Sequence, residues 1–365
     1  MRFTIQREQL LKPLQFVIGV VERRQTLPVL ANVLVVVSEN SLAITGTDLE
    51  VEMVAEAEVK VEAKGEITVP GRKFHDIVRA LPEGVMVEVS VSAERATVKA
   101  GRSRFTLSTL RPSDFPTVEE IGSKQTLRLK RADLRRLIEK THFSMAQQDV
   151  RYYLNGLLLE TEGSTLRAVA TDGHRLALSE VDLAEPATRD EQLIVPRKGV
   201  LELNRLLDGE GEVEVLLGAN HVRVQLEGIR LTSKLIDGRF PEYSRVVPAK
   251  PPNVLLVDRN LFRHALQRTA ILSNEKYRGV RLELGTNSVV LQANNPEQEE
   301  AVETLEVEYG GEGMEIGFNV NYLLDALAAV DTEQVEFGVS DANSSALIRE
   351  PGNDRTKFVV MPMRL

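Results

Sequence analysis

The sequence contains no cysteine, and this absence excludes several kinds of protein at once. Disulfide frameworks, thiolate metal sites and cysteine nucleophiles all require that side chain. A chain without cysteine fits a reducing compartment, so we expect a cytoplasmic protein.

Long hydrophobic runs are missing too. The longest apolar run, Leu27 to Val37, is interrupted by Asn32 and is shorter than the ~20 residues with which a helix crosses a bilayer. Arg7 and Glu8 stand where a signal peptide needs its apolar stretch. We therefore expect neither a membrane span nor a membrane partner.

Signals for catalysis are few. The glycine-rich stretches GEGEVE and GGEGMEIG lack the order of a phosphate-binding loop, and there is no GxSxG elbow. The histidines show no metal-ligand spacing and are His75, His142, His174, His221 and His264. One enzymatic alternative stays open, a metal-dependent hydrolase using Asp172 and His174 of the stretch ATDGHR. A lone loop histidine more often binds or supports structure, so we expect no catalytic residue, no metal and no cofactor.

What the sequence does contain is a threefold repeat. At 365 residues the chain exceeds the size at which one core usually stops growing. Three short landmarks recur in the same order at intervals of 123 to 126 residues, and their marker residues are Thr47, Thr171 and Asn294, then Val69 and Val195, then Phe115 and Phe240. Such a spacing is that of a domain rather than of a solenoid unit. We predict three similar domains, at residues 1–121, 125–246 and 250–365.

Each third alternates helical periodicity with short strands of alternating apolar and polar residues, which indicates an α+β fold with antiparallel sheets. About two helices per third emerge. We predict them at residues 7–19, 72–81, 131–145, 197–208, 259–272 and 319–330.

The charge is distributed unevenly between these helices and the rest of the chain. The predicted helices hold fifteen Lys or Arg against seven Asp or Glu, a net charge of +8, although the whole chain carries −9. Helices lining one surface would give a positive lining and an acidic exterior, which suits sequence-independent binding to DNA phosphates. Two alternatives stay open: Lys and Arg are good helix formers in any case, and an acidic scaffold could bind proteins without binding DNA.

Several collinear motifs resemble the β sliding clamps, the processivity subunits of bacterial DNA polymerase III. They include TGTDLEVEM from Thr45, QDVRYYLNG from Gln148, ATDGHRLA from Ala170, LIDGRFPEY from Leu235 and NNPEQEEA from Asn294. The resemblance covers essentially the full chain. It implies three clamp domains per subunit, and two subunits joined head to tail into a ring whose helices line the hole. It also implies a protein that is not an enzyme but holds a replicative polymerase on DNA.

The resemblance also implies three sets of functional residues. Contacts with double-stranded DNA fall on Arg24, Arg72, Gln148, Tyr152 and Tyr153. The homodimer interface pairs Arg102, Arg104, Phe105 and Leu107 of one subunit with Ile271, Leu272, Glu297, Glu299 and Glu300 of the other. From the residues alone, Tyr153, Phe105 and Leu107 could be core residues of their own domains, and Arg72 could be a solvated residue in the first turn of a helix.

The third set is a pocket for partner peptides that are often led by Gln and end in Leu and Phe. It comprises Leu154, Thr171, Gly173, His174, Arg175, Leu176, Pro241, Arg245, Val246, Ser345, Val359, Val360, Met361, Pro362, Met363, Arg364 and Leu365. An apolar groove with adaptable methionines and a few polar groups has the composition such a site needs. The partners implied are the α subunit of DNA polymerase III, the clamp loader, other DNA polymerases, ligase, mismatch-repair proteins and the holoenzyme's 3'-5' exonuclease.

Overall fold

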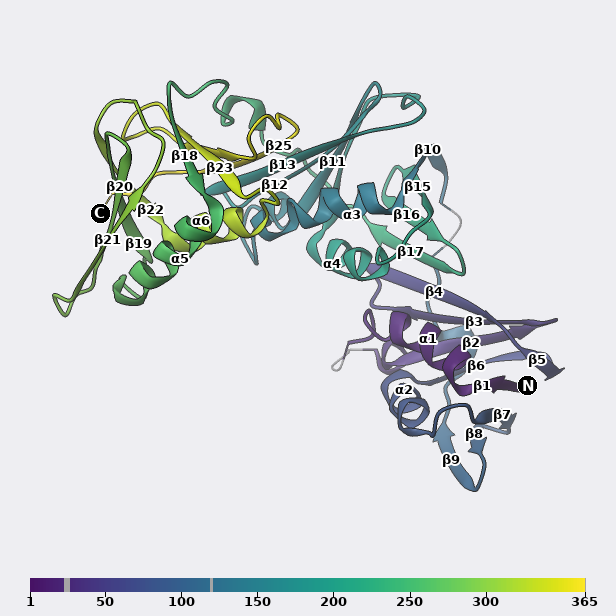
Figure 1. Ribbon diagram of the computed structural model, residues 1–365. Coiled ribbons are helices and arrows are strands. Elements are labelled where there is room, and N and C mark those ends of the chain that lie inside the picture. Colours follow the sequence, from purple (N-terminus) through teal and green to yellow (C-terminus); the bar gives the residue numbers. More distant parts are fainter. Residues whose placement is uncertain (23–26, 119–120, 365) are drawn as a thin grey trace. The chain divides into compact units, whose positions relative to one another are not determined.

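The structure is a computed structural model that describes residues 1–22, 27–118 and 121–364 (Figure 1). The same order of elements occurs three times: a strand, a helix, four strands, a second helix and three strands, with one additional strand, β5, in the first repeat. The threefold repeat read from the sequence is therefore confirmed in the order of the elements.

The bounds of the elements follow the repeats. The first repeat contains β1 (Arg2–Gln6), α1 (Arg7–Val17), β2 (Asn32–Ser38), β3 (Ser41–Thr47), β4 (Val51–Glu58), β5 (Lys60–Ala63), β6 (Gly65–Pro70), α2 (Gly71–Ala80), β7 (Met86–Ser92), β8 (Arg95–Ala100) and β9 (Ser103–Ser108). The second contains β10 (Ser123–Lys130), α3 (Arg131–Glu139), β11 (Gly156–Glu162), β12 (Thr165–Thr171), β13 (Arg175–Asp182), β14 (Glu191–Pro196), α4 (Arg197–Leu206), β15 (Glu212–Gly218), β16 (His221–Leu226) and β17 (Ile229–Lys234). The third contains β18 (Asn253–Asp258), α5 (Arg259–Thr269), β19 (Gly279–Gly285), β20 (Ser288–Asn294), β21 (Glu300–Glu306), β22 (Met314–Asn319), α6 (Val320–Ala328), β23 (Gln334–Val339), β24 (Ala346–Arg349) and β25 (Thr356–Val360).

The strands of each repeat form two sets that pair in the same order every time. The flanking strands, which are the first and the last three of a repeat, run β1-β7-β8-β9, β10-β15-β16-β17 and β18-β23-β24-β25. The middle strands run β6-β2-β3-β4, β14-β11-β12-β13 and β22-β19-β20-β21. Neighbouring strands are antiparallel, as the alternation of apolar and polar residues favours.

Two of the sheets cross from one repeat to the next. Strand β17 pairs with β4, placing Leu231 opposite Met53, and the joined sheet has eight strands. Strand β25 pairs with β13 in the same way, placing Val359 opposite Leu176 in a second sheet of eight strands. Both junctions connect the last flanking strand of a repeat to the third middle strand of the preceding repeat.

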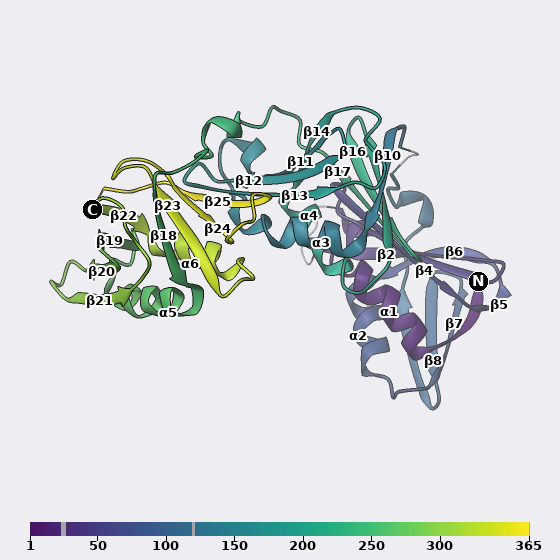
Figure 2. The same ribbon diagram turned by 45° about the horizontal axis from the view of Figure 1, so that its top comes forward.

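These crossing sheets divide the chain into two compact units. One unit contains residues 1–132 and 198–235, and the other contains residues 133–197 and 236–365. In the first unit, α1 packs on β3, β4 and α2. In the second, α5 packs on β20 and β21 and lies beside α6, as the two views show (Figures 1 and 2).

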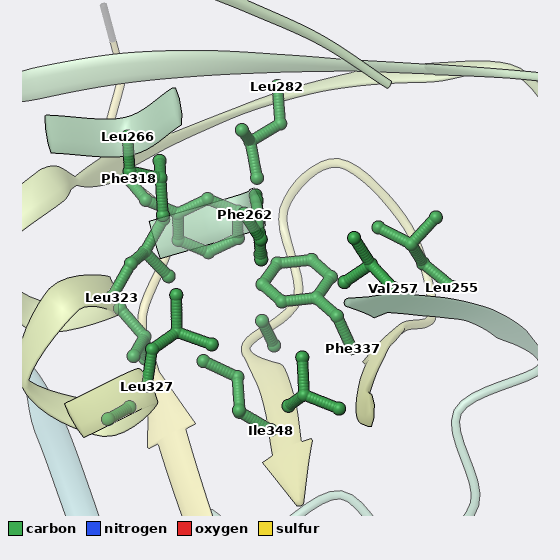
Figure 3. Packing of buried hydrophobic residues seen from close by; sticks show 14 of the residues in the cluster. Leu255, Val257, Phe262, Leu266, Leu282, Phe318, Leu323, Leu327, Phe337 and Ile348 are labelled. Carbon is green, nitrogen blue, oxygen red and sulfur yellow. The ribbon is translucent and has the colours of Figure 1, made fainter. Parts of the chain in front are cut away.

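The core of the third repeat is built around three phenylalanines between the helices and the sheets (Figure 3). Phe337 meets Phe262 and Phe318 edge to face, with ring centroids 6.1 and 5.6 Å away. All three side chains are fully buried, and Leu266 and Leu323 of the two helices pack beside them. Edge-to-face pairs add about 0.5–1.5 kcal/mol each to the free energy gained by burying the rings.

All six predicted helices are present, but their predicted ends extend too far. The largest error is in α3, which ends at Glu139 and not at Met145. Thr141 has a φ of −130°, outside the helical range, and its hydroxyl donates to the carbonyl of Leu137, so the chain continues as a short 3-10 turn. Propensity and periodicity cannot detect such a local side-chain bond.

The charge asymmetry holds for the observed helices. They contain fourteen Lys or Arg against six Asp or Glu, which gives a net charge of +8 in a chain of −9. Helix α5 contributes three arginines and no acidic residue. Among the described residues, no helix is both long and apolar enough to cross a membrane.

Candidate functional site

The first element of the predicted peptide pocket is the turn between β12 and β13. The hydroxyl of Thr171 donates to the carbonyl of Arg175 at 2.6 Å and accepts the amide of Gly173 at 3.1 Å. One carboxylate oxygen of Asp172 accepts the amides of His174 and Arg175 at 2.9 and 3.1 Å. Gly173 has a φ of +88°, which a residue with a side chain adopts only with strain.

The same turn occurs in the first repeat, where Thr47 accepts the amide of Leu49 at 3.1 Å. Asp48 accepts the amides of Glu50 and Val51 at 2.9 and 2.7 Å. A Thr-Asp pair that builds the same turn twice is a structural device. Both carboxylate oxygens of Asp172 are used inside the turn, one by the two amides and the other by the Nε of Arg175. Within the described residues, no three His, Asp or Glu side chains lie close enough to hold a metal ion.

Arg175 is the polar centre of the site. Its guanidinium donates to Asp172 at 3.1 Å, to Asp325 of α6 at 2.5 Å and to the carbonyl of Phe143 at 2.8 Å. It also lies over the rings of Phe143 and Tyr322, with its central carbon 5.7 and 4.6 Å from their centroids. These contacts fix a long cationic side chain in one position.

Tyr322 extends this polar centre toward the exposed His174, whose ring stacks on it with centroids 6.5 Å apart. Burial, with a further contribution from the charge of Asp172, raises the pKa of Tyr322. The phenol therefore stays neutral and able to donate a hydrogen bond. Sequence reasoning missed both Tyr322 and Asp325, because nothing in the sequence relates them to a turn some 150 residues earlier.

The apolar part of the site comes from segments far apart in the sequence. Leu176 of β13 and Val359 of β25 belong to one buried cluster with Leu347, and Val246 packs against it. Val360, which pairs with Arg175, is buried as well. The structure thus brings together predicted pocket residues from three separate stretches of chain.

The C-terminal tail is attached on both sides. The amide of Met361 donates to the carbonyl of His174 at 2.9 Å, and the amide of Met363 donates to the carbonyl of Gly317 in β22 at 2.8 Å. Met361 is exposed, Pro362 and Met363 are half-buried and Arg364 is exposed. The tail therefore runs from the turn of the site to the middle strands of the third repeat.

The remaining predicted pocket residues differ in exposure. Leu154 is buried, Ser345 is half-buried, and Pro241 and Arg245 are exposed. Leu365 lies outside the described residues.

The predicted DNA contacts fall on two places. Arg72 of α2 is half-buried and donates to the carbonyl of Val21 at 2.6 Å, while its Nε has no partner in the described part of the chain. Gln148 and Tyr152 are exposed on the loop before β11, whereas Tyr153 is half-buried against the apolar cluster of the site. Arg24 lies outside the described residues.

This loop has a rigid support that the sequence did not reveal. Asp149 accepts the amide of Arg151 at 2.8 Å and two of its guanidinium nitrogens at 3.1 and 2.9 Å. The side chain of Asn155 bonds both the amide and the carbonyl of Asp149, at 2.9 Å each. The hydrogen bond from Arg151 lowers the pKa of Asp149 to about 2. Val150 and Tyr152 project from this loop into solvent and are 94% and 57% exposed.

The predicted interface residues lie on or beside two edge strands. Arg104, Phe105 and Leu107 are on β9, where Phe105 is half-buried and Leu107 buried, and Arg102 stands exposed just before it. Glu300 begins β21, and Glu297 and Glu299 precede it in the exposed turn. Ile271 and Leu272 lie in the 3-10 turn after α5, which packs on β20 and β21. Ile271 is 75% exposed.

Three tandem α+β repeats with the same order of elements and the same strand pairing define the fold class of the chain. Comparison with known families agrees. Models of the N-terminal, central and C-terminal domains of the DNA polymerase III beta subunit match residues 1–119, 128–242 and 244–364. The chain belongs to this family and is a non-catalytic subunit.

Curated relatives and solved structures are similar over their full lengths. The Beta sliding clamp of Pseudomonas aeruginosa is 58% identical over 367 residues and that of Escherichia coli K12 is 51% identical over 367 residues, with 100% of each chain covered. The crystal structure of the Pseudomonas aeruginosa subunit has a TM-score of 0.98 at 57% identity, covering 100% of both chains. A structure of the sliding clamp from that organism bound to griselimycin has a TM-score of 0.97 at 57% identity, again covering both chains fully.

Proposed function

We propose that two copies of this chain close head to tail into a ring around duplex DNA and hold the replicative polymerase on it. The three domains of each copy would span residues 1–121, 125–246 and 250–365. The ring would stay on the DNA because it is closed around the duplex. Each contact with a phosphate can therefore be weak enough for the ring to slide. As a part of chromosome replication, the protein would work in the cytoplasm.

The observation that carries this proposal is the way in which the repeats join. Both junctions inside the chain pair the last flanking strand of one repeat with the third middle strand of the repeat before it. Only two strands in these two roles keep an open edge in the described part of the chain, β9 and β21. Applying the same pairing rule once more joins β9 of one copy to β21 of another. A head-to-tail contact of this kind closes into a ring when its rotation permits.

The chemistry of the two edges supports this pairing. Arg102 and Arg104 give the β9 edge positive charge, and the exposed Glu300 and Glu306 give the β21 edge negative charge, whereas Glu303 is paired with Arg268 of α5. Exposed apolar groups lie beside the acidic edge, including Ile271 and Val302, which are 75% and 55% exposed. Apolar residues surrounded by complementary charges favour a specific interface.

The basic helices are the surface we assign to DNA. Their net charge of +8 can neutralise phosphates without reading bases, because base recognition requires side chains arranged along a groove. Arg24, Arg72, Gln148, Tyr152 and Tyr153 are the contacts proposed in particular. Arg72 donates one guanidinium nitrogen to the carbonyl of Val21, and the rest of the guanidinium remains for a phosphate.

Partner proteins would dock at the site around Arg175. Leu176, Val359 and Val246 offer apolar surface, and the tail from Met361 provides adaptable thioether side chains and backbone groups. An extended peptide that ends in Leu and Phe suits such a surface. The partners proposed are the α subunit of DNA polymerase III, other polymerases, the clamp loader, ligase and mismatch-repair proteins.

Retention on circular DNA tests the proposal. The chain is loaded onto singly nicked circular duplex by a clamp loader with ATP, and half of the sample is then linearised. We expect protein to stay on the closed circle through a high-salt wash and to run off the linear form. Ile271→Glu, placed in the proposed junction, should lose retention on both forms. Equal, salt-sensitive loss of the unaltered protein from both forms would favour an acidic scaffold that does not encircle DNA.

A further inference from the structure

A cavity of 530 Å³ lies next to the docking site, on the outer face of the middle strands of the third repeat. It is lined by the starts of β19 and β21, the end of β20 and the tail residues Met363 and Arg364. Arg281 and Gln292 face each other across the two strands. Val280 and Leu282, which alternate with Arg281, are fully buried, so the cavity is on the side of the sheet away from the core.

The lining of the cavity is polar and rich in unused hydrogen-bonding groups. Gln292 and Asn294 make no side-chain hydrogen bond within the described part of the chain, and neither does Arg364. Arg281 uses its Nε for Glu315 at 3.2 Å and keeps its terminal nitrogens for another partner. Tyr277, 56% exposed, adds one aromatic face.

The unused donors of this lining favour an acidic ligand. Glu315 pairs with the Nε of Arg281, and Glu300, which the proposed junction shares, is the one carboxylate among the described lining residues, so the donors left for a ligand are the terminal nitrogens of Arg281 and the guanidinium of Arg364. The amide side chains can bond either a peptide backbone or a carboxylate. A cavity with this lining suits an extended, hydrophilic chain segment better than an apolar anchor.

The cavity is continuous with the docking site through the tail. Met361 bonds to the turn of the docking site, and Met363, two residues later, bonds to Gly317 and lines the cavity. An extended chain covers two residues in about 7 Å. A peptide bound beside Met361 therefore reaches the cavity within two or three of its own residues.

We propose that this cavity is a second subsite for partner peptides, which takes an acidic segment that directly flanks the apolar docking motif. The inference rests on the proposed docking function and deepens it. Partners would then differ in affinity through residues outside the motif, because a flank with Asp or Glu gains contacts with Arg281 and Arg364 that a neutral flank lacks. The gain depends on charge, so it decreases as salt increases.

Peptide binding measured by fluorescence anisotropy tests this subsite. The probes are a motif peptide led by Gln and ending in Leu and Phe, and versions extended at either end by a flank with two glutamates or, in the isosteric control, two glutamines. At low salt we expect the glutamate flank, at one of the two ends, to tighten binding by roughly three- to tenfold over glutamine, the range that one hydrogen bond at a solvent-exposed site contributes. The gain should disappear in Arg281→Ala and shrink in Gln292→Ala/Asn294→Ala, while the unextended peptide binds these variants as before.

Arg355→Ala is the matched control. Arg355 is a similarly exposed arginine with one surface ion pair, to Asp182, at the end of β13 opposite to the docking turn. It should leave the gain unchanged. If the unextended peptide binds but neither glutamate flank gains over glutamine, the second subsite is refuted and the docking site stands. If the unextended peptide itself fails to bind, the docking proposal falls and this inference falls with it. A loss of dimer in Arg281→Ala, with no effect of any flank, would assign the cavity to a second copy of the chain instead.

Discussion

Replacing Ile271 with alanine should weaken the dimer strongly without unfolding the subunit. The substitution removes three carbon atoms, which contribute about 0.8 kcal/mol each when fully buried. Ile271 is 75% exposed in the single chain, so about 1.8 kcal/mol per junction remains to be gained on association. A head-to-tail dimer has two such junctions. The expected loss is therefore about 3.5 kcal/mol, or a few hundredfold in the dissociation constant.

Sedimentation velocity over a dilution series measures this constant, and thermal unfolding of each species shows whether the subunit stays intact. Leu261→Ala is the control, since Leu261 is 59% exposed on the neighbouring helix α5 but outside the proposed junction. Its dissociation constant should match that of the unaltered chain. A dimer that Ile271→Ala leaves unchanged, or that both variants weaken equally, would refute the assignment of the junction to β9 and β21.

Three further predictions follow from the packing and the site. Phe337→Ala empties a fully buried position between two other rings and should destabilise the chain by about 3–5 kcal/mol in urea unfolding; a loss below 1 kcal/mol would contradict the packing. Asp149 should titrate by NMR with a pKa of about 2. The stability that its carboxylate contributes is therefore complete above the ordinary pKa of an aspartate and is lost as the pH falls toward 2. In Arg151→Ala the pKa of Asp149 should rise toward the ordinary value, and an unchanged pKa would exclude Arg151 as the cause. Asp325→Ala frees Arg175 from its ion pair with α6 and should weaken motif-peptide binding roughly three- to tenfold with the unfolding midpoint nearly unchanged; equal affinity would show that Asp325 does not position Arg175.

The repeat was predictable because similar short motifs recur at the ends of equivalent strands. Thr47, Thr171 and Asn294 end the equivalent strands β3, β12 and β20. Strand ends that need a tight turn select Thr, Asp and Asn. Thr47 and Thr171 each accept the backbone amide two residues on at 3.1 Å, whereas Asn294 makes no such bond within the described residues. The helices were predictable for a similar reason, since their apolar faces repeat with helical spacing. The sets of strands could be recognised, but their pairing across repeats could not, because no local signal specifies a partner strand 174 to 185 residues away.

The site was predictable only as a set of residue types. The sequence identifies Arg72 as a basic residue on a helix, but not that its guanidinium is partly used by the carbonyl of Val21. It places Arg175 in a turn, but not under the ring of Tyr322 and beside Asp325. Such contacts follow from how the sheets bring distant segments together, and they decide which charged side chains remain available to a ligand.

The chemistry of the junctions explains why the same strand pairing can serve both within a chain and between chains. Inside the chain, paired positions such as Leu231 with Met53 and Val359 with Leu176 are apolar and buried as the chain folds. The edges of β9 and β21 are instead exposed in the single subunit until a second subunit binds. An exposed apolar edge can pair non-specifically with the strand of any other chain. Charges of one sign on each edge, such as Arg104 and Glu300, repel a second copy of the same edge and attract the opposite one. The charged residues therefore select the partner strand, while the shared repeat geometry supplies the pairing itself.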